Sequence, residues 1–129
     1  MQFKSLTFIA AAASLSSIVS ASGDISIDLC FQNNYVNCQN VGFNYNQCYD
    51  FVNPWVDANG LPLARFNDKV NSIKVYDVQG KAKGHCNIFE HTSCGGDTGG
   101  PIGSGNPHPN LAAVGGWGNK ISAMRCVAN

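Results

Sequence analysis

The sequence predicts an all-β protein in which one structural unit occurs twice. Residues 66–75 read FNDKVNSIKV, and a similar stretch, WGNKISAMRC, returns at residues 117–126 with aromatic aligned on aromatic and basic on basic. Upstream of each stretch, two cysteines stand eight residues apart. Apolar residues alternate with polar ones in short runs, and no segment has the long 3.6-residue period of an amphipathic helix. These observations predict short strands in a duplicated chain.

Residues 1–21 have the organisation of a secretory signal peptide. Lys4 supplies a positive charge, residues 6–19 are apolar and rich in alanine, and residues 19–21 offer a small-residue cleavage site. A membrane helix is the alternative, but the apolar run is shorter than about 20 residues and is interrupted by serines. We therefore expect a secreted, extracellular protein without a membrane span. Its mature chain, residues 22–129, is expected to fold as one monomeric domain.

All the cysteines lie in the mature part of the chain, and their number is even. In a secreted domain of this size, this predicts three disulfides in preference to a metal site or a reactive thiol. The cysteines are Cys30, Cys38, Cys48, Cys86, Cys94 and Cys126. Among the fifteen pairings that six cysteines allow, we favour Cys38 with Cys48, because ten residues with an intervening turn can bring adjacent strands together.

The first unit, residues 22–77, begins with a strand pattern. Apolar and polar residues alternate over residues 25–31, and alternation returns at residues 41–45 before a short β-prone run at residues 48–52. Between the first two runs, the sequence NNYVN at residues 33–37 suits a turn. This half is therefore expected to form three short strands before its signature stretch.

A connector at residues 54–62, PWVDANGLP, contains two prolines and a glycine and has no counterpart in the second unit. It carries Trp55, a large aromatic residue for which two roles are open. The indole caps the core from the loop, or it faces solvent as an anchor for a binding partner.

The second unit, residues 85–129, follows a polar hinge at residues 76–84. The second half opens with Cys86, Ile88 and Phe89. Residues 95–110 contain six glycines and three prolines, which predicts a loop, and residues 111–114 are expected to form a short strand. In both units, the signature begins with an aromatic residue and a polar turn and ends as a strand whose alternate residues face the core.

The paired signatures and the two cysteine-flanked starts together resemble the βγ-crystallin superfamily. This resemblance implies two tandem Greek keys packed as a sandwich around one core, here stapled by disulfides. Microbial members of the superfamily include calcium binders, secreted killer-type toxins and a protease inhibitor.

In the calcium-binding members, each turn reads Asn or Asp twice, two variable residues, Ser or Thr, and Ser. Such turns supply the several oxygen ligands that Ca²⁺ needs. The resemblance implies these candidate ligands: Asn67, Asp68, Asn71, Ser72, Asn119 and Ser122. The second turn departs from the pattern at Gly118 and Ala123, and Asp68 is the one carboxylate in the two turns, so only weak binding is expected. Alternatively, these residues only hydrogen-bond the turn backbone.

Charge argues against nucleic-acid or anionic-membrane partners. The mature chain has seven Lys or Arg against eight Asp or Glu, with no basic cluster beyond Lys81 and Lys83. Both kinds of partner require a basic face.

Catalysis is also not expected. The string SCGGDTGGPI at residues 93–102 resembles the nucleophile segment of chymotrypsin-like proteases, with Thr98 in the place of the serine. Such enzymes need a histidine base, an aspartate and two β-barrels, whereas this chain is about half that size. Glu90 is the only glutamate, and no pair of carboxylates stands out as an acid and base.

The sequence therefore predicts a secreted, non-enzymatic effector or interaction module, weakly calcium-binding at most, whose partner is an extracellular protein or carbohydrate. One alternative is a killer-type toxin, although the basic or amphipathic face typical of toxins is missing. Another is an inhibitor that inserts a loop such as residues 53–65 into an extracellular hydrolase.

Overall fold

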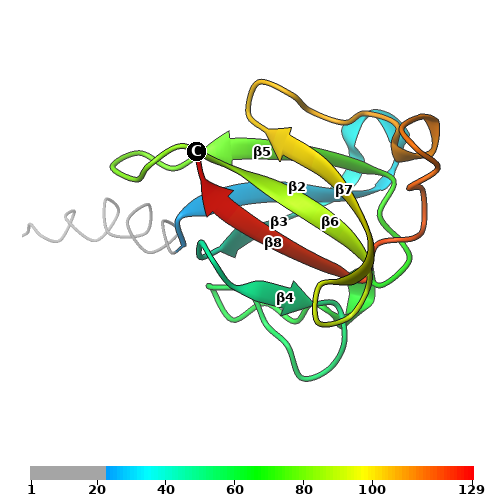
Figure 1. Ribbon diagram of the computed structural model, residues 1–129, viewed down its shortest axis with the longest axis horizontal. Coiled ribbons are helices and arrows are strands. Elements are labelled where there is room, and N and C mark those ends of the chain that lie inside the picture. The colour runs from blue at the N-terminus through cyan, green and yellow to red at the C-terminus, as the bar shows by residue number, and fades with distance from the viewer. Residues whose placement is uncertain (1–22) are drawn as a thin grey trace, which may run out of the picture.

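The computed structural model describes residues 23–129, so the predicted signal peptide lies outside the described residues. Two antiparallel sheets pack face to face, as predicted for an all-β sandwich (Figure 1). The first sheet has the order β3-β2-β5 and the second β4-β8-β6-β7. The strands are β2 (Ile25–Gln32), β3 (Val36–Phe43), β4 (Cys48–Asp50), β5 (Ser72–Asp77), β6 (Gly84–His91), β7 (Gly95–Gly103) and β8 (Ala123–Ala128). Three short 3-10 turns are η1 (Asn33–Tyr35), η2 (Ala64–Phe66) and η3 (Leu111–Ala113).

Each half of the chain gives one segment to the sheet of the other half. Strand β4, from the first half, pairs with β8, with Tyr49 opposite Met124. In return, His108 of the second half bridges to Ile73 at the edge of the first sheet through two backbone hydrogen bonds of 3.0 Å. This exchange interlocks two Greek keys, as the resemblance implied. The unit boundaries given above, residues 22–77 and 85–129, stay a prediction.

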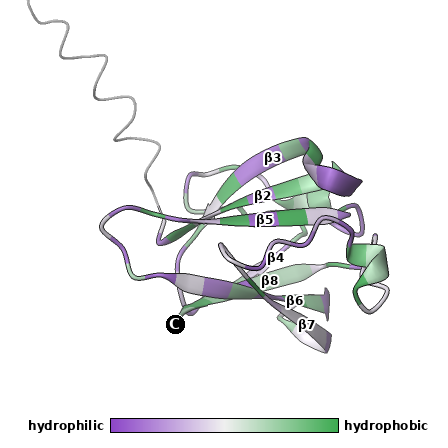
Figure 2. Ribbon diagram, turned by 90° about the horizontal axis from the view of Figure 1, so that it is seen from above, coloured by the Kyte–Doolittle hydropathy of each residue, from purple (hydrophilic) through white to green (hydrophobic). Residues whose placement is uncertain are grey.

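The core lies between the two sheets, which Figure 2 shows as stacked layers. The two signatures supply equivalent core residues, because each repeats the same aromatic residue, turn and strand. The aligned pairs, all at most 9% exposed, are Phe66 and Trp117, Val70 and Ile121, and Ile73 and Met124. The alternation predicted for β2 holds for Ile25, Ile27 and Leu29, which are fully buried, but ends there, because Cys30 is also buried and Phe31 only partly so.

The three disulfides are confirmed, and the favoured pairing is wrong. The bonds join Cys30 to Cys38, Cys48 to Cys94 and Cys86 to Cys126. Cys30 lies directly opposite Cys38 in the β2–β3 pair, with 3.9 Å between their Cα atoms. Cys48 lies in the other sheet, so Cys38 and Cys48 are not on adjacent strands.

Two segments differ from the expectation. Residues 95–103 form β7 instead of a loop, because pairing with β6 uses backbone groups and does not need side chains. Gly99 also allows close approach: a Cβ there would lie 2.6 Å from the Trp117 ring. Residues 111–113 form a 3-10 turn and not a strand, with Leu111 buried at its start. Among residues 23–129, no helix is long and apolar enough to cross a membrane.

Candidate functional site

The two polar turns of the signatures lie side by side and hold each other through the backbone. The first turn comprises residues 67–72 and the second residues 118–123. The Asp68 amide donates to the Ile121 carbonyl at 3.0 Å, and the Asn119 amide donates to the Val70 carbonyl at 3.2 Å. Asp68 (φ 55°) and Asn119 (φ 57°) share a left-handed conformation, which Asp and Asn tolerate better than most residues. The two turns are therefore structural equivalents.

Side chains also pair across this junction: the fifth residue of each turn donates a hydrogen bond to the second residue of the other turn. Asn71 donates through Nδ2 to Oδ1 of Asn119 at 2.9 Å, and we call these two residues the closed pair. Ser122 donates through Oγ to Oδ1 of Asp68 at 3.4 Å, and we call these two the open pair. Each potential site thus draws on both turns.

The closed pair is filled by the amide of Asn71. Its Nδ2 also donates to the carbonyls of Phe31 at 2.9 Å and Lys69 at 3.5 Å. A cation bound here would need these same oxygens, but the amide donor already satisfies them. Asn71 therefore substitutes for a cation in this half of the junction.

The open pair borders a shallow hollow of about 340 Å³, which we call the cation hollow. Its lining residues are Asp68, Glu90, His91, Asn119, Lys120 and Ser122. The backbone N–H of Asn71 donates to the Cys30 carbonyl. In the same way, the backbone N–H of Ser122 donates to the Phe89 carbonyl. By this equivalence, Glu90 is the counterpart of Phe31 and Lys120 the counterpart of Lys69. Asn71 caps the carbonyls of Phe31 and Lys69. Their counterparts, Glu90 and Lys120, border the hollow.

The charge in the cation hollow favours a cation only modestly. Asp68 and Glu90 contribute carboxylates. Lys120 opposes them, although its Nζ lies 5.8 Å from the centroid of the Trp117 ring and so interacts with that ring. His91 places Nε2 3.8 Å from Glu90 Oε1 and pairs with it when protonated. Sequence reasoning did not include Glu90 as a ligand, because aligning the cysteines matches Cys30 with Cys86, whereas in the structure the counterpart of Cys30 is Phe89.

The structure separates the remaining candidate ligands. Ser72 is fully buried, donates to the Gln32 carbonyl at 2.6 Å and accepts from the Tyr35 amide at 3.1 Å, so it braces η1. Asn67 has a buried Oδ1 without a hydrogen-bond partner and lies outside the hollow lining. In the described part of the chain, no three His, Cys, Asp or Glu residues are grouped to hold a metal. A cation here would depend on hydroxyl, amide and backbone oxygens as well.

Trp55 lies between the two positions considered for it, and its role as a partner anchor stays a prediction. The side chain is half-buried against the core and meets Tyr49 edge-on, with 6.3 Å between ring centroids. It also lines a hollow of about 260 Å³ with Gln47, Pro54 and Val56. Trp55 therefore closes the core and leaves part of its surface accessible to a partner.

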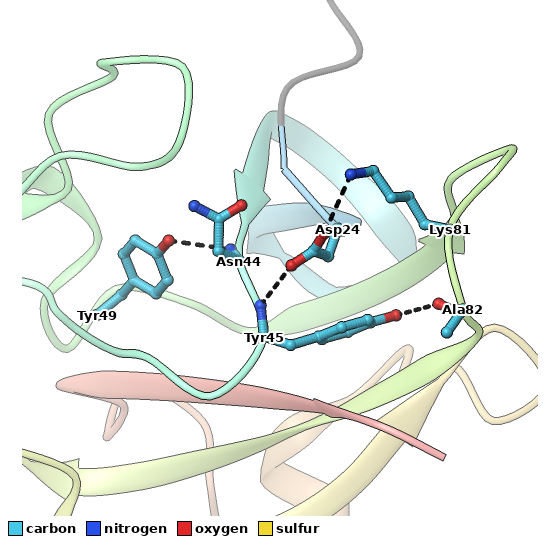
Figure 3. A network of polar contacts seen from close by, with 6 residues as sticks. All are labelled: Asp24, Asn44, Tyr45, Tyr49, Lys81 and Ala82. Atoms are coloured by element: carbon cyan, nitrogen blue, oxygen red, sulfur yellow. Dashed lines mark hydrogen bonds and ion pairs between the residues drawn. The ribbon is translucent and has the colours of Figure 1, made fainter.

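A polar network fixes the predicted hinge between the halves (Figure 3). Asp24 accepts from the Tyr45 amide at 2.9 Å and lies 3.4 Å from Nζ of Lys81. The Tyr45 hydroxyl donates to the Ala82 carbonyl. Burial, followed by the charges of Asp24 and Asp77, raises the pKa of Tyr45 above its ordinary value. The hinge is thus bonded to the loop that follows β3.

Similar folds occur among solved structures. A βγ-crystallin domain from Flavobacterium johnsoniae is 18% identical, has a TM-score of 0.54 and matches 82% of this chain and 96% of its own. The N-terminal domain of protein S is 15% identical with a TM-score of 0.55, over 80% of this chain and 96% of its own. A βγ-crystallin domain from Clostridium beijerinckii is 14% identical with a TM-score of 0.53, over 81% and 99%. No family model and no curated protein matches the chain.

Proposed function

The chain has a βγ-crystallin-like fold, and from this premise we propose a secreted, monomeric, non-enzymatic binding protein that takes one weakly held calcium ion in the cation hollow. Three disulfides fit an oxidising extracellular environment and support secretion. The signal-peptide pattern of residues 1–21 supports the same destination.

The observation that carries the calcium proposal is the difference between the closed and open pairs. Asn71 satisfies the oxygens of the closed pair with its own amide. Ser122, whose side chain is shorter, leaves a hollow that two carboxylates border. Ca²⁺ takes six to eight oxygens in flexible geometry, so Asp68, Glu90 and Ser122 would hold it with water completing the shell. So few charged ligands predict a Kd of about 10⁻⁴–10⁻³ M.

Thermal unfolding with calcium and with chelator tests this proposal. A ligand that binds only the folded state stabilises it, so about 10 mM calcium is expected to add about 1.4–2.7 kcal/mol and raise Tm by several degrees. Asp68→Asn should remove most of this rise. Asp97→Asn is the matched control, because Asp97 is an exposed aspartate on β7. A wild-type Tm that stays within about a degree would overturn the calcium proposal.

A hydrolase inhibitor is the second candidate, and the connector supports it. Asp57 is 4% exposed and accepts from the amides of Gly42, Asn59 and Leu61 at 2.7–2.9 Å. This fixes the loop while Asn59 and Gly60 stay exposed at its tip. An inhibition panel of extracellular proteases and glycosidases at micromolar protein tests the idea, and a panel without inhibition removes it. Growth of competing microbes with purified protein tests the killer-toxin alternative in the same way.

A further inference from the structure

The outer face of the first sheet carries an ordered group of aromatic and polar side chains. Core residues of β2 and β5 alternate with residues that point away from the core. In the pairing register, Asp28 lies opposite both Asn40 and Lys74, and Ser26 lies opposite Tyr76. We call this surface the tyrosine face; it consists of Ser26, Asp28, Tyr35, Asn40, Lys74 and Tyr76. Five of these residues lie on the three strands of one sheet, which gives that part of the face a fixed shape, and Tyr35 lies in η1 beside them.

The two aromatic rings of this face are held in place. The Lys74 Nζ lies 5.3 Å from the centroid of the Tyr35 ring and 5.8 Å from that of the Tyr76 ring, so the ammonium interacts with both. The Tyr76 hydroxyl donates to Asp28 Oδ2 at 3.0 Å, yet the side chain is 39% exposed. A ring that is both exposed and anchored loses little entropy when a ligand packs on it.

The polar groups beside the rings are also ordered and carry little net charge. Asn40 donates through Nδ2 to Asp28 Oδ1 and to Ser26 Oγ, both at 2.9 Å. The carboxylate of Asp28 and the ammonium of Lys74 lie on neighbouring strands and offset each other. The Asn40 carbonyl, the Ser26 hydroxyl and the Lys74 ammonium keep further hydrogen-bonding capacity.

From this combination, we propose that the tyrosine face binds a neutral hexose polysaccharide. The apolar C–H face of a sugar ring packs on an aromatic ring, and sugar hydroxyls both donate and accept hydrogen bonds. A polyanion is disfavoured because Asp28 offsets Lys74 and leaves the face without a net positive charge to attract it. A protein partner is disfavoured because the core of a protein interface is depleted of charged residues, whereas this face has a charged pair at its centre.

Binding assays with insoluble and soluble glycans test the proposal. The probes are cellulose, β-1,3-glucan, chitin and mannan as neutral polymers, with polygalacturonate as the acidic one. At least one neutral polymer should retain the wild-type protein. Tyr76→Ala should weaken that binding about two- to tenfold, the usual effect of losing one aromatic contact. The matched control is Arg125→Ala, an exposed residue on β8 of the other sheet.

Two further measurements keep the outcome decisive. Amide chemical shifts of the wild-type protein, titrated with the soluble oligosaccharide of the retained polymer, should change on β2, β3 and β5. Asp68→Asn should bind the polymer as the wild type does, which separates this proposal from that of calcium binding. The proposal is overturned by retention on polygalacturonate alone, by no retention on any polymer, or by shift changes confined to residues outside the tyrosine face.

Discussion

The closed and open pairs of the turn junction share one backbone geometry and differ in what a single side chain reaches. Asp68 and Asn119 have nearly the same positive φ, and both turns exchange equivalent backbone hydrogen bonds. Asn71 extends far enough to donate to two carbonyls and to Asn119, whereas Ser122 reaches only Asp68. Duplication therefore preserves a scaffold, while side-chain length at one position decides whether its oxygens stay available to an ion.

The largest expected effect tests whether the first turn depends on the aromatic residue before it. Phe66 is fully buried and packs against Phe31 and Phe51, with ring centroids 5.7 and 5.9 Å away. Phe66→Ala should cost about 3–5 kcal/mol of unfolding free energy, because it leaves a cavity in the core. Chemical denaturation measures this, with Val36→Ala as a control that truncates an exposed apolar side chain. A cost below about 1 kcal/mol would mean that the first turn does not rest on this ring.

The next effect converts the closed pair into an open one. Asn71→Ser removes the amide and leaves the Phe31 carbonyl and Asn119 Oδ1 without their donor. Without calcium, the variant should lose about 1–3 kcal/mol of stability. The closed half has no carboxylate, because Asn119 and Phe31 stand where the open half has Asp68 and Glu90, so Asn71→Ser is combined with Asn119→Asp for the calcium measurement. With calcium, isothermal titration should find two bound ions in the double variant instead of one. One ion in both proteins would show that the amide is not what excludes the cation.

The reverse change should close the open pair. Ser122→Asn places an amide where its donors can meet Asp68 and the backbone of Glu90 and Lys120, as Asn71 does in the other half. We expect the calcium-induced stabilisation of about 1.4–2.7 kcal/mol to disappear. No charge is removed by this substitution, so lost binding could not be attributed to a weaker field. Melting curves with calcium and with chelator are the measurement, and an undiminished rise in Tm would contradict the comparison.

How far the sequence could lead is visible at these same residues. Alignment of the two signatures was enough to predict the strands β5 and β8, because periodicity and repetition are local properties. The resemblance identified both turns. Neither the alignment nor the resemblance showed that the side-chain amide of Asn71 occupies the oxygens of the closed pair. This contact joins residues 48 positions apart in the sequence and depends on the length of the Asn71 side chain.

Other features depended on contacts between distant segments. Cys38 and Cys48 are close in sequence, but β4 crosses to the second sheet, so proximity along the chain did not predict the pairing. The glycine-rich β7 has no side-chain pattern to mark it as a strand and is specified by its backbone pairing with β6. Glu90 borders the cation hollow through its place in the fold, which a ligand motif in the turns does not include.

The smallest expected effect concerns the lysines that occupy the same position in the two turns. Lys120 borders the cation hollow. Its counterpart Lys69 lies in the first turn, beside the closed pair, where its carbonyl accepts from the side-chain amide of Asn71. An ammonium about 6 Å from a divalent cation opposes binding by about 1 kcal/mol in a solvent-exposed setting, before screening by salt. Lys120→Met should therefore tighten calcium binding about fivefold at low ionic strength.

Lys69→Met is the matched control for this last comparison, because it removes the same charge from the turn beside the closed pair. It should leave the calcium affinity within about a factor of 1.5, since screening grows with distance from the open pair. Titration at two salt concentrations adds a second criterion, because the Lys120→Met effect should shrink as ionic strength rises. Equal tightening by both variants would mean that calcium responds to the overall charge of the junction, and the assignment of binding to the open pair would then be wrong.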